Sequence, residues 1–262
     1  MAELAIRFED GAAYDRGMGR WSLLAGEVFL DWLAPQRGAQ WIDVGCGSGA
    51  FAELLYQRCA PAEVQGVDPS DAQLAFARER RSVRDAQFQV GNATALPFVD
   101  DRFDAAVMAL VIFFVPDPAK GVAEMVRVVR PGGIVAAYAW DMTGGGFPFE
   151  PVRIGLRDFG FTPLSPPRVD ASRMDALRNL WTAGGLESIE TREISVHRTF
   201  NDFADFWAMS TASGTIQPIL AAMSADDIER LKQHVQAMLP TDSSGRVTYN
   251  ARANAVKGRV PQ

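Results

Sequence analysis

The chain has 262 residues, of which 48% are hydrophobic and 22% are charged, and its formal net charge at pH 7 is −6. A chain of this length and composition buries a core large enough to fold without disulfides or structural metals, which excludes the disulfide-rich and the disordered classes. The acidic balance, with no long basic run, also argues against a nucleic-acid backbone as the main partner, because such binding relies on clustered Lys and Arg.

The cysteines and the apolar runs indicate the compartment. Cys46 and Cys59 form no CxxC pair, so neither a disulfide framework nor a zinc site is expected. The first ten residues include acidic side chains and no apolar h-region, which predicts no secretory signal. The longest apolar run, Ala105–Val115, is too short to span a bilayer. We therefore expect a cytoplasmic protein with no membrane partner and no metal.

The first half of the chain shows a regular alternation of strand and helix patterns. Apolar residues at helical spacing over Tyr14–Leu33 predict one or two amphipathic helices. The runs that follow predict right-handed crossovers and a mostly parallel α/β sheet. The expected strands are Gln40–Val44, Glu63–Val67, Ala86–Val90, Phe103–Ala109 and Ile134–Trp140, and the expected helices are Ala50–Cys59, Asp71–Arg80 and Ala119–Val129.

The second half is less regular. The segment Asp141–Ser172 is rich in Gly and Pro and predicts a loop or lid. We hypothesise that this segment and Val196–Ser213 form a lid that selects a substrate. Beyond residue 172 the patterns predict helices over Arg173–Ala183, Asn201–Ser213 and Ala225–Leu239, and strands over Glu187–Val196 and Val247–Ala255. The whole chain, 1–262, is expected to be one domain, with N-terminal helices at 1–38, a ligand-binding core at 39–140, and the lid and C-terminal half of the sheet at 141–262.

A glycine-rich turn is the strongest functional motif. The stretch Asp43-Val-Gly-Cys-Gly-Ser-Gly49 directly follows an apolar strand and precedes a helix. Glycines at alternate positions allow a sharp turn and close approach of a ligand to the backbone. The spacing is G-x-G-x-G rather than the G-x-G-x-x-G typical of dinucleotide sites. The acid that leads the turn favours a ligand end carrying an ammonium group over a pyrophosphate.

Two polar positions follow the next two strands. Asp68 lies 19 residues after Gly49, at the tip of the second strand, where a carboxylate accepts bonds from both hydroxyls of an adenosine ribose. Taken alone, Asp68 is as well explained as a helix cap. Asn92, in Gly91-Asn-Ala-Thr-Ala-Leu-Pro-Phe98, offers both a donor and an acceptor to the edge of an adenine. The alternative for this segment is an ordinary polar turn.

As an ordered set, these motifs resemble the class I methyltransferases that depend on S-adenosylmethionine (SAM), and most closely the small-molecule group related to ubiquinone and menaquinone biosynthesis methyltransferases. Phe103-Asp104 and Val129-Arg-Pro-Gly-Gly133 extend the resemblance, which covers about residues 41 to 140. It implies a Rossmann-like sheet of seven strands, mostly parallel, with helices on both faces and an antiparallel last strand. It also implies SAM as cofactor and S-adenosylhomocysteine (SAH) as product.

The resemblance implies a role for each matched residue. The Gly45–Gly49 turn, with Gly45, Cys46, Gly47 and Gly49, would hold the amino-acid portion of SAM, and Asp43 would lie near its ammonium group. Asp68, followed by Pro69, would bind the ribose, and Asn92 with the backbone of Ala93 would meet the adenine. Ala109 and Leu110 would line the floor beneath the methyl group. The family usually carries Asp at the position of Asn92, so one negative charge is missing here.

Residues outside the matched motifs are weaker candidates. Tyr14 and Arg20, on the first helix, either close over SAM, with Arg20 pairing with its carboxylate, or belong to an ordinary amphipathic helix. His197 is the candidate general base, should the acceptor have to lose a proton. Because aromatic side chains are frequent in the second half, the expected partner is a small-molecule acceptor that is apolar or aromatic.

Other functions compatible with these motifs are a protein methyltransferase and a non-catalytic SAM-binding protein. A nicotinamide-dependent oxidoreductase is disfavoured by the glycine spacing and by Arg130-Pro-Gly-Gly133 before the fifth strand. The fourth strand also lacks the Asn-Pro-Pro-aromatic pattern of enzymes that methylate planar nitrogens. Methyl transfer by in-line displacement to a small molecule is the expected reaction.

Overall fold

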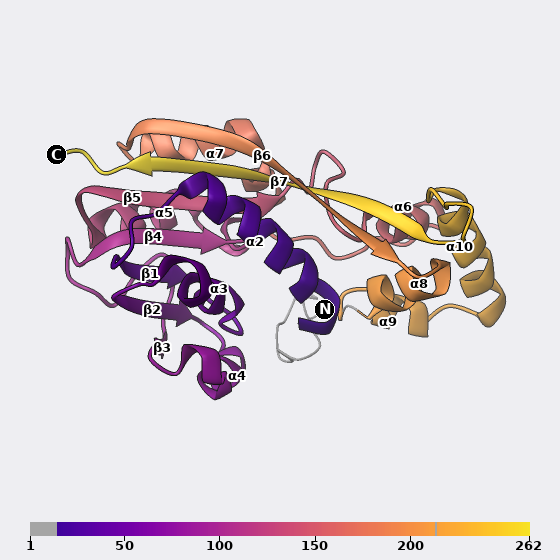
Figure 1. Cartoon of the computed structure of the whole chain (residues 1–262). Coiled ribbons are helices and arrows are strands. Elements are labelled where there is room, and N and C mark those ends of the chain that lie inside the picture. The colour runs from indigo at the N-terminus through magenta and orange to yellow at the C-terminus, as the bar shows by residue number, and fades with distance from the viewer. Residues whose placement is uncertain (1–14, 213) are drawn as a thin grey trace.

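A seven-stranded sheet organises the protein, and its strand order is β3-β2-β1-β4-β5-β7-β6 (Figure 1). The structure is a computed structural model that describes residues 15–212 and 214–262, with side chains from Gly17 onward. Tyr14 lies outside the described residues. The strands are β1 (Gln40–Val44), β2 (Glu63–Asp68), β3 (Gln87–Val90), β4 (Phe103–Ala109), β5 (Val129–Trp140), β6 (Glu187–Phe200) and β7 (Val247–Arg259).

Strand directions follow from the crossovers. β1 to β5 pair in parallel, and β7 pairs antiparallel with both β5 and β6. The central strands are apolar because helices cover both of their faces; β4, with the sequence FDAAVMA, has four buried residues in succession. The Rossmann-like sheet with an antiparallel last strand is therefore confirmed.

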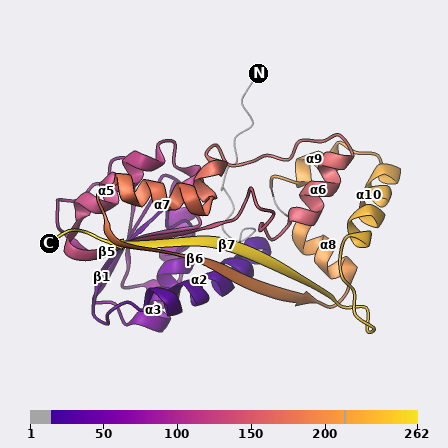
Figure 2. The same cartoon turned by 90° about the horizontal axis from the view of Figure 1, so that it is seen from above.

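Helices lie on both faces of the sheet (Figure 2). Helices α2 and α3 lie on one face, and α5 and α7 lie on the other (Figures 1 and 2). Trp181 of α7 donates its indole N–H to the Val135 carbonyl of β5 at 2.9 Å, and Phe29 of α2 packs on Tyr138 of β5 at 4.7 Å. The helices are α2 (Arg20–Leu33, after a π-helical turn at Asp15–Gly19), α3 (Ala50–Cys59), α4 (Asp71–Glu79), α5 (Pro118–Val128), α6 (Glu150–Asp158), α7 (Met174–Ala183), α8 (Phe203–Thr211), α9 (Gln217–Ala221) and α10 (Ala225–Ala237). None of the described helices is long and apolar enough to cross a membrane.

A two-stranded ribbon carries a separate group of helices. β6 and β7 extend beyond the carboxyl ends of the parallel strands, and α6, α8, α9 and α10 gather around the far end of this ribbon (Figures 1 and 2). We call these four helices the helical lobe. A salt bridge from Arg252 of β7 to Asp141, 2.9 Å long, ties the start of the first lobe segment to the ribbon.

The structure corrects the expectation of a loop over Asp141–Ser172. Helix α6 occupies Glu150–Asp158, with a proline in its first turn and an amphipathic pattern that buries Val152 and Leu156. The pattern was hidden because Gly144-Gly-Gly146 and several prolines flank a helix of only nine residues. β6 also continues to Phe200, four residues past its expected end.

Candidate functional site

A cavity of about 1010 Å³ lies at the carboxyl ends of the parallel strands. Its walls come from the segments that follow β1, β2, β3 and β4, together with the first turn of α2. In an open α/β sheet this edge is where ligands bind. Of the residues expected to bind a cofactor, the cavity is lined by Arg20, Asp43, Gly45, Cys46, Gly47, Asp68, Pro69, Asn92, Ala93, Ala109 and Leu110.

The glycine turn has the backbone conformation that its sequence predicts. Gly45, Gly47 and Gly49 have φ of +78°, +50° and +78°, a region that costs little only for glycine. A Cβ on Gly45 would lie 2.4 Å from Val111, whereas a Cβ on Gly47 would meet nothing nearer than 3.8 Å. The side of the turn at Gly47 is therefore open toward the cavity.

Gly49 differs from the other two glycines. It does not line the cavity. A Cβ there would lie 3.1 Å from that of Ala77 and 3.3 Å from the Phe88 ring. The structure thus places Gly49 at a packing contact between the start of α3, α4 and β3, where it permits close approach of these elements.

Asp43 is a buried carboxylate without a partner. Its side chain is fully buried, and neither carboxylate oxygen has a hydrogen-bond partner within the described part of the chain. Burial, and next the charge of Asp68, raise the pKa of Asp43 to about 7. A buried carboxylate is costly unless a cation or a hydrogen-bond donor satisfies it. The cavity therefore contains an acceptor site that suits a cationic group.

We expect stability without ligand to depend on pH through Asp43. The raised pKa means that the folded state binds more protons than the unfolded state between about pH 4 and pH 7, so stability falls as pH rises through this window. Asp43→Asn removes the titrating group, and its stability should change less over that range. Urea denaturation of both proteins from pH 4.5 to 8 measures the difference, and parallel curves would contradict the prediction.

Asp68 joins the end of β2 to the glycine turn. Its Oδ2 accepts the Gly47 N–H at 3.0 Å, and its Oδ1 accepts the Ser70 N–H at 2.9 Å. Burial raises the pKa of Asp68 above its ordinary value, while these two hydrogen bonds lower it. Each carboxylate oxygen has a further lone pair for a ligand hydroxyl. Asp68 also orients the turn itself, a second role that its position in the sequence did not indicate.

Asn92 lies at the exposed rim of the cavity. Its Oδ1 accepts from the Thr94 N–H at 2.9 Å and from the Thr94 hydroxyl at 3.0 Å. These two donors fix the orientation of the amide, so its NH₂ group is the part left to meet a ligand. An aspartate would keep both bonds from Thr94 and would offer a second oxygen instead of the NH₂ group.

We therefore expect Asn92→Asp to fold normally and to bind SAM with a dissociation constant within about threefold of the original. Asn92→Ala, which removes both the Thr94 bonds and the ligand-facing group, should bind more weakly. Calorimetric titration with SAM measures both. A large loss in the aspartate variant, with folding intact, would show that the adenine end of the ligand is held in another way.

Arg80 is a cavity residue that sequence reasoning missed. It follows α4, and its Nε donates to the Ser48 carbonyl at 2.6 Å, while its Nη1 forms a salt bridge with Glu53 at 2.7 Å. It thus ties the end of α4 to the glycine turn and to α3. No local pattern marks this role, because the partners lie about 30 residues away in the sequence.

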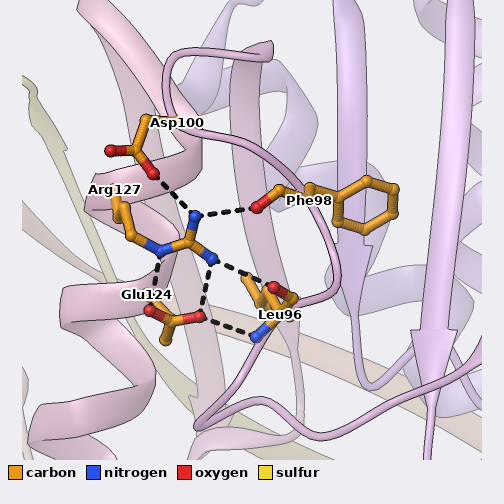
Figure 3. Close-up of polar contacts among 5 residues, drawn as sticks. All are labelled: Leu96, Phe98, Asp100, Glu124 and Arg127. Carbon is orange, nitrogen blue, oxygen red and sulfur yellow. Dashed lines mark hydrogen bonds and ion pairs between the residues drawn. The ribbon is translucent and has the colours of Figure 1, made fainter.

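Arg127 of α5 holds the loop that follows Asn92 (Figure 3). Its guanidinium donates to the carbonyls of Phe98 at 2.7 Å and Leu96 at 3.0 Å, and pairs with Asp100 at 2.8 Å. Glu124, one turn earlier, pairs with Arg127 and accepts the Leu96 N–H at 2.7 Å. Backbone groups of the loop are thus bound to a rigid helix, which positions Asn92 and Ala93 at the cavity.

We expect Arg127→Met to destabilise the protein by about 2–4 kcal/mol, since several charge-assisted hydrogen bonds are lost and two carbonyls lose their donors. Hydrogen exchange in residues 92–100 should accelerate. Arg84→Met is the matched control, because Arg84 is 82% exposed and makes one weak ion pair of 3.9 Å. Equal urea midpoints for the two variants would contradict this role of Arg127.

The floor of the cavity includes a strained residue. Leu110 has a φ of +64°, which is unusual for a side chain of this size, and its N–H donates to the Tyr138 carbonyl at 2.8 Å. Tyr138, Val111 and Phe114 also line the cavity, although the sequence did not single them out as cofactor residues. The strain at Leu110 marks the end of β4 as a place where backbone geometry serves the site.

The two histidines lie elsewhere. His197 is exposed on β6 and does not line the cavity, so the structure gives no support to its assignment as general base. His234 of α10 lies 2.8 Å from Asp158 of α6 within the helical lobe. Trp207 of α8 has Lys232 of α10 5.9 Å from its ring, and it too is absent from the cavity wall. No group of three or more metal-ligating side chains occurs among the described residues.

Comparisons with known proteins agree with this geometry. Residues 42–137 match the family described as "Methyltransferase domain". A demethylmenaquinone methyltransferase of Renibacterium salmoninarum is 35% identical over 161 residues, which cover 57% of this chain and 63% of that protein. An uncharacterized protein of Mycobacterium tuberculosis is 35% identical over 135 residues, covering 48% of this chain and 49% of its own. The chain thus spans about half to two thirds of the length of these relatives.

Similarity of fold extends over most of the chain. A geranyl diphosphate methyltransferase, solved in complex with SAM, superposes with a TM-score of 0.55 at 19% identity, covering 92% of this chain and 87% of that one. At this identity the likeness concerns the fold. Residues 42–137 thus match a methyltransferase domain, and the whole chain, with its seven-stranded sheet, has the fold of solved SAM-dependent methyltransferases.

Proposed function

We propose that the protein transfers a methyl group from SAM to a small-molecule acceptor. The observation that carries the proposal is the buried, unpartnered carboxylate of Asp43, which lines the cavity beside the open side of the glycine turn at Gly47. A cationic amino group beside this turn satisfies the carboxylate, and a dinucleotide pyrophosphate does not. The demethylmenaquinone methyltransferase relative supports a small acceptor.

Each cavity residue takes a share in holding SAM. Asp43 meets the ammonium group, directly or through water, and Gly45–Gly49 supplies backbone N–H groups to the amino-acid portion. Asp68 accepts the ribose hydroxyls, and Asn92 with Ala93 borders the adenine. Arg20, in the first turn of α2, faces the cavity and is available to a carboxylate.

The chain's contribution to catalysis is positioning and exclusion of water. Bound SAM supplies a methyl group already activated on its sulfonium. Leu110 and Val111 after β4, with Tyr138 from β5, form an apolar wall that orients the reacting ends for an in-line displacement. No histidine stands on this wall within the described residues, which favours an acceptor that reacts without a histidine base.

The helical lobe is proposed to form the acceptor side. It stands beyond the carboxyl ends of the strands, as does the cavity (Figure 1). If it closes over ligand, hydrogen exchange in α6 and α8 should slow when SAH binds. Phe206→Ala is a more direct probe of the lobe than Trp207→Ala. The Phe206 ring packs 5.2 Å from the Phe200 ring on the ribbon, whereas Trp207 packs toward α10. Exchange that is indifferent to ligand would contradict a closing lobe.

Calorimetric titration with SAM, SAH and NADH tests the proposed function. We expect SAM and SAH to bind and NADH not to bind. Asp43→Asn should lose most of the affinity for SAM, because the buried carboxylate is the partner of the ammonium group. Binding of NADH in preference to SAM would overturn the proposal. Binding of SAM with no turnover on any quinol or other aromatic acceptor would identify a non-catalytic SAM-binding protein instead.

A further inference from the structure

Arg198 is a cation on an apolar face. Arg198 lies on the same face of β6 as the buried side chains of Val196 and Phe200, and the residues between them are exposed. Its guanidinium carbon lies 5.5 Å from the Trp21 ring of α2 and 4.9 Å from the Phe200 ring. Stacking on aromatic faces is favourable for an arginine, but it uses none of the five N–H donors.

Several donors around Arg198 have no acceptor among the described residues. Arg198 Nη1, Trp21 Nε1 and Ser210 Oγ are each buried without a hydrogen-bond partner in the described part of the chain. Ser210 lies one turn after Phe206 on α8, and Phe206 packs on Phe200, which brings this face of α8 to the cluster. Leaving a buried donor unpaired costs about 1–3 kcal/mol, and more when the donor is charged. The group that is missing here is an acceptor of hydrogen bonds.

The charges near Arg198 also indicate that an anion is missing from this position. Arg20, which lines the cavity, forms no ion pair within the described residues. Burial lowers the pKa of Arg198, and the charge of Arg20 lowers it further, because the two cations lie near each other. Asp205 is the carboxylate that acts on Arg198, but its Oδ2 is hydrogen-bonded to the backbone and side-chain N–H groups of Asn201, each at 3.1 Å. Among the described residues, neither of these neighbouring cations is bonded to an anion; Arg20 lines the cavity, and Arg198 lies outside its wall.

We propose that Arg198 binds an anionic group of the methyl acceptor, a carboxylate or a phosphate, with Arg20 adding positive potential from the cavity side. This inference rests on the proposed function, because it assigns a chemical class to the acceptor of the same site. The rings of Trp21, Phe200, Phe206 and Tyr249, whose centroids lie 5.2–6.4 Å apart, pack against one another beside Arg198. The acceptor inferred here is a small molecule that carries an oxyanion.

Binding of small probes tests the proposal without any turnover. The protein is saturated with SAH and titrated calorimetrically with benzoate, with phenyl phosphate, and with benzamide as the neutral isostere of benzoate. We expect at least one anion to bind about 10-fold or more tightly than benzamide, as a charged hydrogen bond predicts. The stronger of the two anions distinguishes a carboxylate from a phosphate acceptor.

Variants assign the effect to Arg198. Arg198→Met keeps the length and the aromatic contacts and should abolish the preference for anions, while the SAH dissociation constant stays within about twofold. Arg192→Met, an exposed arginine on the same strand, is the matched control and should leave the preference unchanged. Arg198→Lys, which keeps the charge but not the planar guanidinium, should retain the preference for anions with several-fold weaker binding. This variant replaces Arg198→Met in the test if the methionine variant does not fold.

Two results would overturn the proposal: equal affinity of the unmodified protein for benzoate, phenyl phosphate and benzamide, or an anion preference that survives in Arg198→Met. Failure of SAH to bind to the unmodified protein is a different result, because it contradicts the proposed function. The probe titrations are then repeated without SAH, and they decide on the anion subsite by the same criteria.

Discussion

Asp68→Ala is expected to weaken SAM binding by about 100-fold or more while the protein remains folded. Two hydrogen bonds from a carboxylate to the ribose, each worth about 1.5–3 kcal/mol, account for a loss of this size. The structure adds a second cause, since Asp68 also accepts the Gly47 N–H at 3.0 Å and so holds the turn in place. Calorimetry with SAM measures the loss.

Two further variants separate these causes. Asp71→Ala, at an exposed position three residues later, is the matched control and should bind SAM normally. Asp68→Asn keeps one oxygen and places an NH₂ group against one of the two backbone donors. Its loss of SAM affinity should therefore lie between those of the control and the alanine variant. An unchanged dissociation constant in Asp68→Ala would remove this residue from the site.

Gly45→Ala is expected to cause the largest loss of stability among single substitutions in the turn. A residue with a Cβ at a φ of +78° costs about 1–2 kcal/mol. The new methyl group would also lie 2.4 Å from Val111, and such overpacking costs about 1–3 kcal/mol more. Because Val111 lines the cavity, the shift that relieves the clash should also weaken SAM binding. Urea denaturation and SAM titration measure the two effects.

Gly38→Ala is a control for the backbone term alone. Gly38 has a φ of +76°, but a Cβ there would meet nothing within 4 Å. It should lose about 1–2 kcal/mol and keep its affinity for SAM. Val111→Ala combined with Gly45→Ala should recover part of the stability by removing the clash. Equal stability of the Gly38 and Gly45 variants would show that the contact with Val111 is relieved at no cost.

The core of the fold was predictable because local patterns dictate it. Buried parallel strands read as short apolar runs, and the G-x-G-x-G turn specifies its own positive φ angles, so β1 to β5 and the positions of Asp43 and Asp68 followed from the sequence. Contacts between distant segments did not follow. Arg80 and Arg127 act on loops about 30 residues away, and no periodicity in the sequence records such a partner.

The position of His197 shows a second reason why part of the site could not be predicted from the sequence. The sequence predicted that the strand ends at Val196, which would have left His197 in a loop near the site. In the structure β6 continues to Phe200, and alternation along a strand then decides the face of every side chain. Val196 and Phe200 turn inward, so His197 is exposed on the opposite face. An error of four residues in a strand end is thus enough to misplace the side chain of His197.

The place of β7 in the sheet has a consequence for synthesis of the protein on the ribosome. β7, at Val247–Arg259, is translated after the six other described strands of the sheet, yet it lies between β5 and β6 rather than at an edge. Until residue 259 has left the exit tunnel, β6 has no hydrogen-bonding partner and the ribbon that carries the helical lobe does not exist. The SAM-binding half can become ordered during translation, since domains generally fold from the N-terminus. The helical lobe can take its place only after β7 has been translated, and until then β5 and β6 each present an unpaired edge to chaperones and proteases.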